Sequence, residues 1–234
     1  GNDNYGNIFS SLIKEKNIED DGIIIDNDRP TTTKTRVIAN SQHIVRIDKE
    51  SKSYINHKIE SKILAYIESK INKLDGIILQ DYNKGILTPS LISNIISIAN
   101  KKDILVTVDP KFDNFFEYKN VTVFKPNKKE TETVLGIRIK DDKDISSAGR
   151  NLLKKLNSKY VLLTLGEGGI AVFEDGDKEK RMPTKAIKVA DVSGAGDTVI
   201  STLTIGLAAG ADIYEACFLA NYAAGIVCGE VGIV

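Results

Sequence analysis

The octapeptide Asp-Val-Ser-Gly-Ala-Gly-Asp-Thr occupies residues 191–198 and leads directly into an apolar segment with helical spacing. Gly194, Ala195 and Gly196 have little or no side chain, so their backbone N–H groups can converge on an anion. The start of the following helix adds free N–H groups and the positive end of its dipole. Asp197 can then accept a hydroxyl proton beside a stabilised phosphoryl charge. We predict that it is a catalytic base; the alternative is a tight turn with a helix-start carboxylate.

The segments before this octapeptide alternate between strand-like and helix-like patterns. Apolar runs of strand length lie at residues 76–80, 104–109, 121–125 and 160–165. Apolar residues recur at helical spacing at residues 89–100 and 146–156, and Thr88 with Pro89 is a typical helix start. Such alternation predicts an α/β fold in which helices cover both faces of a parallel sheet.

Two segments depart from this alternation. Residues 31–39 and 42–48 are polar strand-like runs joined by Asn40 and Ser41, which predicts a projecting two-residue hairpin. It would be either a flap over a site or a solvated edge hairpin. Residues 198–209 and 213–227 form two helices that are too apolar for the surface, so we expect both to pack in the core.

The composition excludes several classes of function. Lys plus Arg equals Asp plus Glu at 32 each, so no global charge attracts nucleic acid or a membrane surface. No apolar run of the 234 residues has the length of a membrane span. The two cysteines, Cys217 and Cys228, lie in an apolar segment, which favours buried free thiols and a reducing cytoplasm. The presence of only two histidines, His43 and His57, argues against a zinc site or a histidine-based triad.

The octapeptide resembles the signature of the ribokinase (PfkB-type) carbohydrate kinases, which is Asp-x-x-Gly-Ala-Gly-Asp before an apolar helix. Residues 127–130, Asn-Lys-Lys-Glu, match the family's Asn-x-x-Glu motif, which organises magnesium and phosphate. Residues 164–169, Thr-Leu-Gly-Glu-Gly-Gly, match its nucleotide loop. The three motifs stand in the family's order. The resemblance implies one ribokinase-like three-layer α/β/α sandwich over residues 1–234, with a small β-hairpin lid at about 31–48.

The same resemblance implies the cofactors and the binding residues. ATP would lie along Thr164, Gly166 and Gly168 and along residues 194–196, with Asn221 near the base. Asn127 and Glu130 offer hard oxygen ligands that suit Mg²⁺ held mostly through water. Their spacing also fits a helix capping box. A monovalent cation such as K⁺ would lie near Asp191, and the lid would form a homodimer.

A narrower resemblance is to the heptose 7-phosphate kinases. It rests on residues 30–39, 45–48, 81–85 and 108–111. It implies an ATP-dependent kinase that converts D-glycero-D-manno-heptose 7-phosphate to the 1,7-bisphosphate for the lipopolysaccharide core. Lys84, Lys111, Arg36 and Arg46 are the candidates for phosphate contacts. Ser193 stands where the family has Thr, and Glu230 and Ile233 replace Lys and Thr.

Three alternatives stay open. Residues 166–171 fit the loose dinucleotide fingerprint G-x-G-x-x-A, but this fingerprint must open a helix, whereas residues 170–174 predict another strand. No Walker-type P-loop is present. The substrate could be another sugar or sugar phosphate, or the chain could be a kinase-like binding protein without turnover.

The first residues resemble an internal turn of the family. Residues 1–6, Gly-Asn-Asp-Asn-Tyr-Gly, resemble the turn Gly-x-Asp-x-x-Gly that family members have well inside the domain. The family's first core strand, an acidic sugar-binding residue and a Gly-Gly-x-x-Asn loop precede that turn. We therefore expect the natural polypeptide to extend upstream of residue 1.

Overall fold

The computed structural model describes residues 1–39, 42–184 and 192–230. The chain divides into two compact units. The first contains residues 1–70 and 84–88, and the second contains residues 71–83 and the described residues from 89 onward. Asn40 and Ser41 of the predicted hairpin turn, and Asp191 of the glycine-rich octapeptide, lie outside the described residues.

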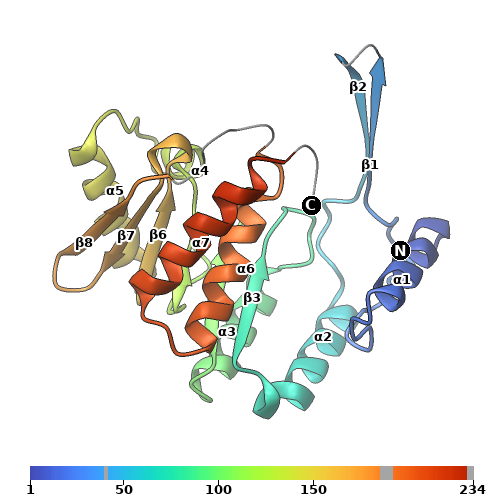
Figure 1. The fold of residues 1–234 in the computed structure, drawn as a ribbon. Coiled ribbons are helices and arrows are strands. Elements are labelled where there is room, and N and C mark those ends of the chain that lie inside the picture. Colours follow the sequence, from blue (N-terminus) through green and yellow to red (C-terminus); the bar gives the residue numbers. More distant parts are fainter. Residues whose placement is uncertain (40–41, 185–191, 231–234) are drawn as a thin grey trace. The chain divides into compact units, whose positions relative to one another are not determined.

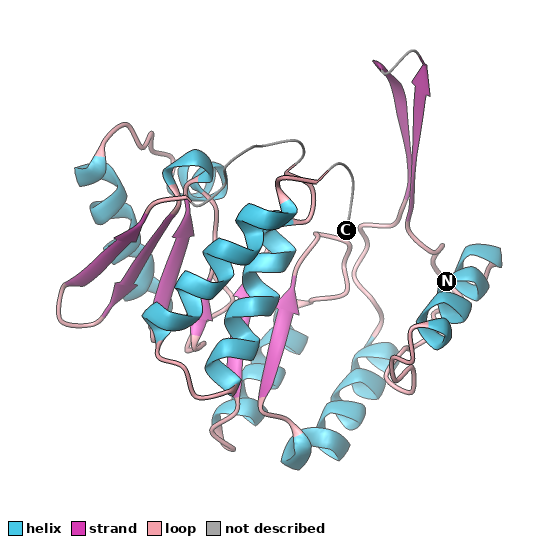
Figure 2. Ribbon diagram, in the orientation of Figure 1, coloured by secondary structure: helices cyan, strands magenta, loops and turns pink. Residues whose placement is uncertain are grey.

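The second unit is built on a sheet of six strands, in the order β3-β4-β5-β6-β7-β8 (Figure 2). Their bounds are Gly76–Gln80 (β3), Leu105–Asp109 (β4), Val123–Phe124 (β5), Tyr160–Thr164 (β6), Ile170–Glu174 (β7) and Lys178–Met182 (β8). The first four are parallel, and β7 and β8 are antiparallel to their neighbours. All four strands predicted from apolar runs are present, although β5 is shorter than expected.

Helices cover both faces of this sheet. They are α3 (Pro89–Asn100), α4 (Lys128–Leu135), α5 (Asp142–Leu156), α6 (Ala195–Ala208) and α7 (Ile213–Val227), with short 3₁₀ turns at Ile71–Lys73 and Gly166–Gly168. In Figure 1, α6 and α7 lie side by side on the near face, whereas α3 and α5 lie behind the sheet. The predicted three-layer α/β/α sandwich is confirmed.

The sheet is not parallel throughout, which corrects the prediction. Only residues 165–169 separate β6 from β7, and only residues 175–177 separate β7 from β8. A parallel connection needs a crossover of a dozen or more residues, so these short links force antiparallel pairing. Gly176 and Asp177 have φ values of 73° and 59°, as a tight hairpin turn requires.

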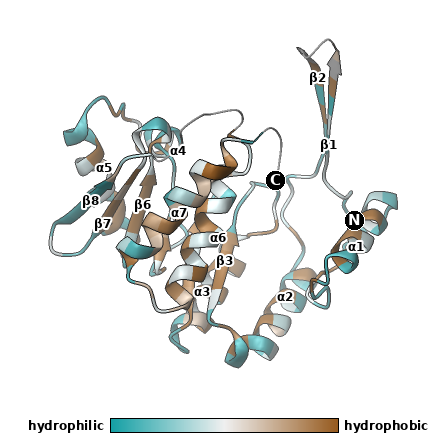
Figure 3. Ribbon diagram, viewed as in Figure 1, coloured by the Kyte–Doolittle hydropathy of each residue, from teal (hydrophilic) through white to brown (hydrophobic). Residues whose placement is uncertain are grey.

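The two apolar helices pack as predicted on one side only. Ile200 and Leu203 of α6, with Cys217 and Ala220 of α7, join sheet residues such as Leu162 in a buried cluster. The opposite side of α7 exposes Phe218, Leu219, Tyr222 and Ile226. Apolar colour accordingly extends along α6 and α7 in Figure 3, whereas the edge strand β8 is hydrophilic. The expectation that both helices pack in the core is therefore wrong for the exposed face of α7.

The first unit contains two helices and the hairpin. The elements are α1 (Asn4–Glu15), β1 (Thr33–Ala39), β2 (Gln42–Lys49) and α2 (His57–Lys70). Asp3 caps α1, because its Oδ1 accepts from the Gly6 N–H at 2.9 Å, and its Oδ2 accepts from the Thr31 N–H at 2.9 Å. The strands β1 and β2 pair in antiparallel register, which confirms the predicted hairpin.

A stability prediction arises from Gly149, where α5 crosses β7. A Cβ atom at this position would overlap the ring of Phe173, which is buried and has no room to move. Gly149→Ala should therefore lower the free energy of unfolding by about 1–3 kcal/mol. The higher helix propensity of alanine, about 1 kcal/mol, offsets part of that loss. Thermal melts should show a lower Tm for Gly149→Ala than for the wild type. The control is Ser147→Ala, at an exposed position of the same helix. An unchanged or higher Tm for Gly149→Ala would contradict this packing.

Candidate active site

One cavity lies at the carboxyl ends of the parallel strands, where ligands bind in open α/β sheets. Its volume is about 680 Å³. Most of the site residues predicted from the sequence line it, namely Lys111, Asn127, Thr164, Gly166, Ala195, Gly196, Asp197 and Asn221. Four lining residues that were not predicted as site residues are Gln80, Tyr82, Asp109 and Lys125. Together, these residues lie at or just after the ends of β3, β4, β5 and β6, in the first turn of α6 and within α7, which are far apart along the chain. The fold thus brings the predicted motifs into one site.

The glycine-rich octapeptide forms the start of α6. Gly194 is the N-cap and has φ 81°, a left-handed conformation that favours glycine. Because a glycine has no side chain, it cannot cap the N–H groups of the first turn, and the Ala195 N–H donates to the Val192 carbonyl at 3.3 Å instead. Asp197 lies in that turn. Asp197 is therefore not itself the N-cap, and the anion cradle stays a prediction.

Tyr82 contacts Asp197 directly. The phenol of Tyr82 donates a hydrogen bond to Oδ1 of Asp197 at 2.9 Å. Burial and this hydrogen bond raise the pKa of Tyr82 to about 12. The phenol is therefore protonated at neutral pH, so it serves as a donor rather than as a base. Sequence reasoning did not single out Tyr82, because the two residues are 115 positions apart.

A buried ion pair lies under the cradle. Lys125 Nζ is 3.0 Å from Asp109 Oδ1, and both side chains are almost fully buried. Gln80 donates to Asp109 Oδ2 at 2.9 Å. A Cβ atom added to Gly196 would lie 3.6 Å from Lys125 Nζ and 3.7 Å from Asp109 Oδ2, so the pair packs directly against the glycine. A charged residue at the end of an apolar strand was the signal that could have identified Asp109 and Lys125.

Asn127 and Glu130 form the N-terminus of α4. The Asn127 side chain accepts from the Glu130 N–H at 2.8 Å, and the Glu130 carboxylate accepts from the Asn127 N–H at 2.9 Å. The capping box is therefore present. The other Glu130 oxygen is paired with the ammonium of Lys111. Both oxygens of this buried carboxylate are thus engaged within the protein.

The remaining predicted nucleotide residues lie around the same cavity. The Thr164 N–H donates to the Pro126 carbonyl at 3.0 Å, which joins the nucleotide loop to the Asn127 turn. Asn221 Nδ2 donates to the Pro183 carbonyl at 2.7 Å. Gly169 has φ 80°, and a Cβ atom there would overlap the Met182 carbonyl. Gly168 belongs to the 3₁₀ turn Gly166–Gly168 and does not itself line the cavity, whereas Gly166 does.

Three of the predicted phosphate-binding residues belong to the first unit. Arg36 and Arg46 are directly opposite each other in the hairpin register, so they lie on the same face. Arg46 Nη2 is also 3.1 Å from Asp48 Oδ2. Lys84 pairs with Glu50, and its carbonyl accepts from Arg29. Their binding of a substrate phosphate stays a prediction.

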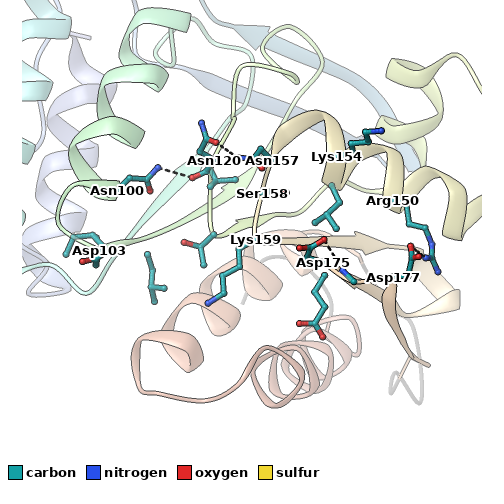
Figure 4. Close-up of a pocket in the computed structure, with 17 residues that line it drawn as sticks. Asn100, Asp103, Asn120, Arg150, Lys154, Asn157, Ser158, Lys159, Asp175 and Asp177 are labelled. Carbon is teal, nitrogen blue, oxygen red and sulfur yellow. Dashed lines mark hydrogen bonds and ion pairs between the residues drawn. The ribbon is translucent and has the colours of Figure 1, made fainter.

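A larger cavity lies at the opposite edge of the sheet, by the amino ends of β4, β5 and β6 (Figure 4). Its volume is about 950 Å³. Asn120 lies between Asn100 and Asn157, which donate to its carbonyl at 3.0 Å and to its side chain at 2.7 Å. None of the predicted site residues lines it. The smaller cavity is therefore the candidate active site.

Both cysteines are free, but their surroundings differ. Cys217 is buried, and burial raises the pKa of its thiol to about 12. Cys228 is only partly buried and lines the candidate active site. The expectation of two buried thiols is thus correct for Cys217 alone. Within the described residues, no helix combines the length and the apolar character that crossing a membrane requires.

Comparison with known families decides the wider assignment. The model of the pfkB family carbohydrate kinases matches residues 1–234. The chain belongs to this family. The pfkB match agrees with the three motifs, which the fold brings to one cavity.

Relatives and solved structures agree with the pfkB assignment. The bifunctional protein HldE of Geobacter sulfurreducens is 40% identical over 232 residues, which are 99% of this chain and 47% of that protein. HldE of Helicobacter pylori strain J99 is 41% identical over 232 residues, which are 99% of this chain and 50% of that protein. The chain thus spans about half the length of the curated relatives it matches.

Among solved structures, phosphofructokinase-2 of Escherichia coli in complex with potassium has a TM-score of 0.79 at 18% identity, covering 98% of this chain and 74% of that one. Arabidopsis thaliana ribokinase complexed with ribose and ATP has a TM-score of 0.73 at 22% identity, covering 100% and 75%. At these identities the likeness shows the fold.

Proposed function

We propose that this pfkB-family chain transfers the γ-phosphoryl group of ATP to a hydroxyl group of a sugar, with Asp197 as the base. The single observation that carries the proposal is the position of Asp197, in the first turn of a helix whose N-cap is Gly194. A carboxylate placed there meets a hydroxyl proton and the N–H groups that stabilise phosphoryl charge in one location. Gly194, Ala195 and Gly196 form the cradle.

The proposed reaction is an in-line displacement at the γ-phosphorus. Asp197 accepts the proton of the sugar hydroxyl while the hydroxyl oxygen of the sugar forms a bond to phosphorus. The bond from phosphorus to the bridging oxygen breaks, and ADP leaves with that electron pair. Asp197 then returns its proton to solvent. Lys125 packs against Gly196, where Asp109 balances its charge.

Magnesium would neutralise the phosphate charge of the bound nucleotide. Because both Glu130 oxygens are engaged, Glu130 does not fit as a direct ligand. Asn127 and Glu130 fit the water-mediated contact that the sequence predicts, since Mg²⁺ keeps several waters. The described residues contain no cluster of three or more His, Cys, Asp or Glu side chains for a metal. The proposed monovalent cation near Asp191 lies outside the described part of the chain.

We further propose that the substrate is a sugar that already carries a phosphate, specifically D-glycero-D-manno-heptose 7-phosphate. The motifs at residues 30–39 and 81–85 support this branch, as do the relatives named HldE. The arginine pair Arg36 and Arg46 adds a physical argument. Like charges directly opposite in a hairpin destabilise it, and the Asp48 carboxylate that pairs with Arg46 leaves Arg36 for a second anion. We infer that a sugar phosphate is this anion.

The hairpin also supports the proposal of a lid that forms a homodimer. Residues Val37, Val45 and Ile47 lie on the face opposite to the arginines and are exposed. A second copy of the hairpin would bury this apolar face. Residues 31–48 would then be the lid of a kinase domain that includes residues 1–234. We place the reaction in the reducing cytoplasm, where the two free cysteines persist.

A coupled assay for ADP release with a panel of sugars and sugar phosphates tests the proposed activity. At least one sugar should stimulate ADP release well above the rate without sugar. ATP binding without stimulation by any of them would instead favour the kinase-like binding protein.

The cysteines give a second test, which concerns nucleotide binding. Cys228 lines the cavity, whereas Cys217 is buried and its thiol stays protonated. A thiol reagent should therefore modify Cys228 in the folded protein, and saturating ATP should slow this reaction about 10-fold or more. Peptide mass spectrometry identifies the modified residue, with Cys217 as internal control. Equal rates of Cys228 modification with and without ATP would place the nucleotide elsewhere.

A further inference from the structure

The contact between Tyr82 and Asp197 has a consequence for the proposed reaction. Tyr82 is the second residue after β3, and Asp197 is the third residue of α6. The phenol donates to Oδ1 of the carboxylate at 2.9 Å. An ionised carboxylate accepts through both oxygens, so this bond leaves Oδ2 for a second donor. The sugar hydroxyl is that donor in the proposed reaction.

The backbone that carries Tyr82 is held by a buried network. Asp81 is buried, and its Oδ2 accepts from the phenol of Tyr118 at 2.7 Å. Its Oδ1 accepts from the Asn83 N–H at 2.7 Å, and Asn83 has φ 52°. The Asp81 N–H donates to the Asp109 carbonyl at 3.0 Å. The turn on both sides of Tyr82 is thus fixed to the core before any ligand arrives.

The same turn connects Tyr82 to the ion pair under the cradle. Gln80, two residues before Tyr82, donates to Asp109 Oδ2 at 2.9 Å. Asp109 in turn pairs with Lys125 at 3.0 Å. Asp109 therefore joins the buried ion pair to the turn that carries Tyr82, through the Gln80 side chain and the Asp81 N–H. These contacts orient the turn.

We propose that Tyr82 is a positioning residue, whose phenol holds the Asp197 carboxylate so that Oδ2 faces the hydroxyl group that is to be phosphorylated. The inference rests on the proposed kinase function and deepens it. Tyr82 takes no proton in the reaction, because its pKa of about 12 keeps the phenol protonated. Asp197, by contrast, is exposed in the first turn of α6.

The variant Tyr82→Phe tests this role, because it removes only the hydroxyl. Misalignment of a catalytic group lowers turnover without changing nucleotide binding, so kcat should fall about 10-fold while the KM for ATP stays unchanged. The matched control is Tyr222→Phe on α7, another half-exposed tyrosine, which does not line the cavity. Its kcat should equal that of the wild type. Both variants should melt at the wild-type temperature.

A double-mutant cycle separates positioning from a general structural effect. In the Asp197→Asn background, the additional change Tyr82→Phe should have almost no effect on the residual single-turnover rate, because the group it positions is gone. An independent loss of about 10-fold in that background would overturn the inference. So would a kcat for Tyr82→Phe within twofold of the wild type. A wild-type protein without sugar-dependent turnover would overturn the proposed function, and the inference with it.

Discussion

Replacing Asp197 with asparagine should lower kcat by at least about 10²-fold, and by as much as about 10⁴-fold, in the full-length protein. An asparagine amide has nearly the shape of the carboxylate but cannot accept the proton of a sugar hydroxyl. The cradle of Gly194, Ala195 and Gly196 is made of backbone, so it is unaffected. The affinity for ATP should therefore stay within about twofold of the wild type, by equilibrium titration, while turnover is lost.

The matched control is Asp212→Asn, at the start of α7. Asp212 is also a helix-start carboxylate, and it accepts from the N–H groups of Tyr214 and Glu215 at 2.7 and 2.9 Å. Asparagine caps helices as well as aspartate does, so this variant should keep full activity. If Asp197→Asn retains more than a tenth of the wild-type turnover, Asp197 is a helix-start carboxylate and not the base.

The second large effect concerns the phosphate that the substrate already carries. D-glycero-D-manno-heptose 7-phosphate should have a kcat/KM at least about 10²-fold higher than free ribose or fructose. Two charge-assisted hydrogen bonds to a phosphate contribute roughly 1.5–3 kcal/mol each, which corresponds to a factor of this size or more. Steady-state assays with each sugar at several concentrations measure the ratio.

The arginine pair supplies the control for this prediction. Changing Arg36 and Arg46 together to glutamine should reduce the preference for the phosphorylated sugar and leave the KM for ATP unchanged. Equal kcat/KM values for a phosphorylated and an unphosphorylated sugar would reject the heptose 7-phosphate proposal. The chain would then remain a pfkB-family member with another substrate.

Local sequence patterns were sufficient to predict much of the sandwich. The helices α3 and α7 have the predicted bounds, because their apolar spacing is regular and Pro89 and Asp212 mark their starts. Helix α5 begins at Asp142 rather than at residue 146, since its first turn is acidic and capped by Asp141. The edge strand β8 has the sequence Lys-Glu-Lys-Arg-Met. Such charges protect a sheet edge from pairing with another chain, but they lack the apolar pattern by which a strand is predicted from sequence.

The candidate site was predictable where one loop carries the chemistry. The octapeptide at residues 191–198 indicated an anion cradle, and the spacing of Asn127 and Glu130 indicated a capping box. The contacts of Tyr82 with Asp197, and of Asp109 with Lys125, were not predictable. They join residues from different strands and helices, so only the parallel arrangement of β3, β4 and β5 brings them together.

The most direct test of the central claim is to follow the phosphoryl group itself. Phosphorus NMR of a reaction with ATP, Mg²⁺ and D-glycero-D-manno-heptose 7-phosphate reports where that group goes. The wild type should give a new signal from a phosphate on the anomeric oxygen, together with ADP, and Asp197→Asn should form it about 10²-fold or more slowly. Release of inorganic phosphate alone, or an equal rate of sugar phosphorylation by Asp197→Asn, would contradict the claim.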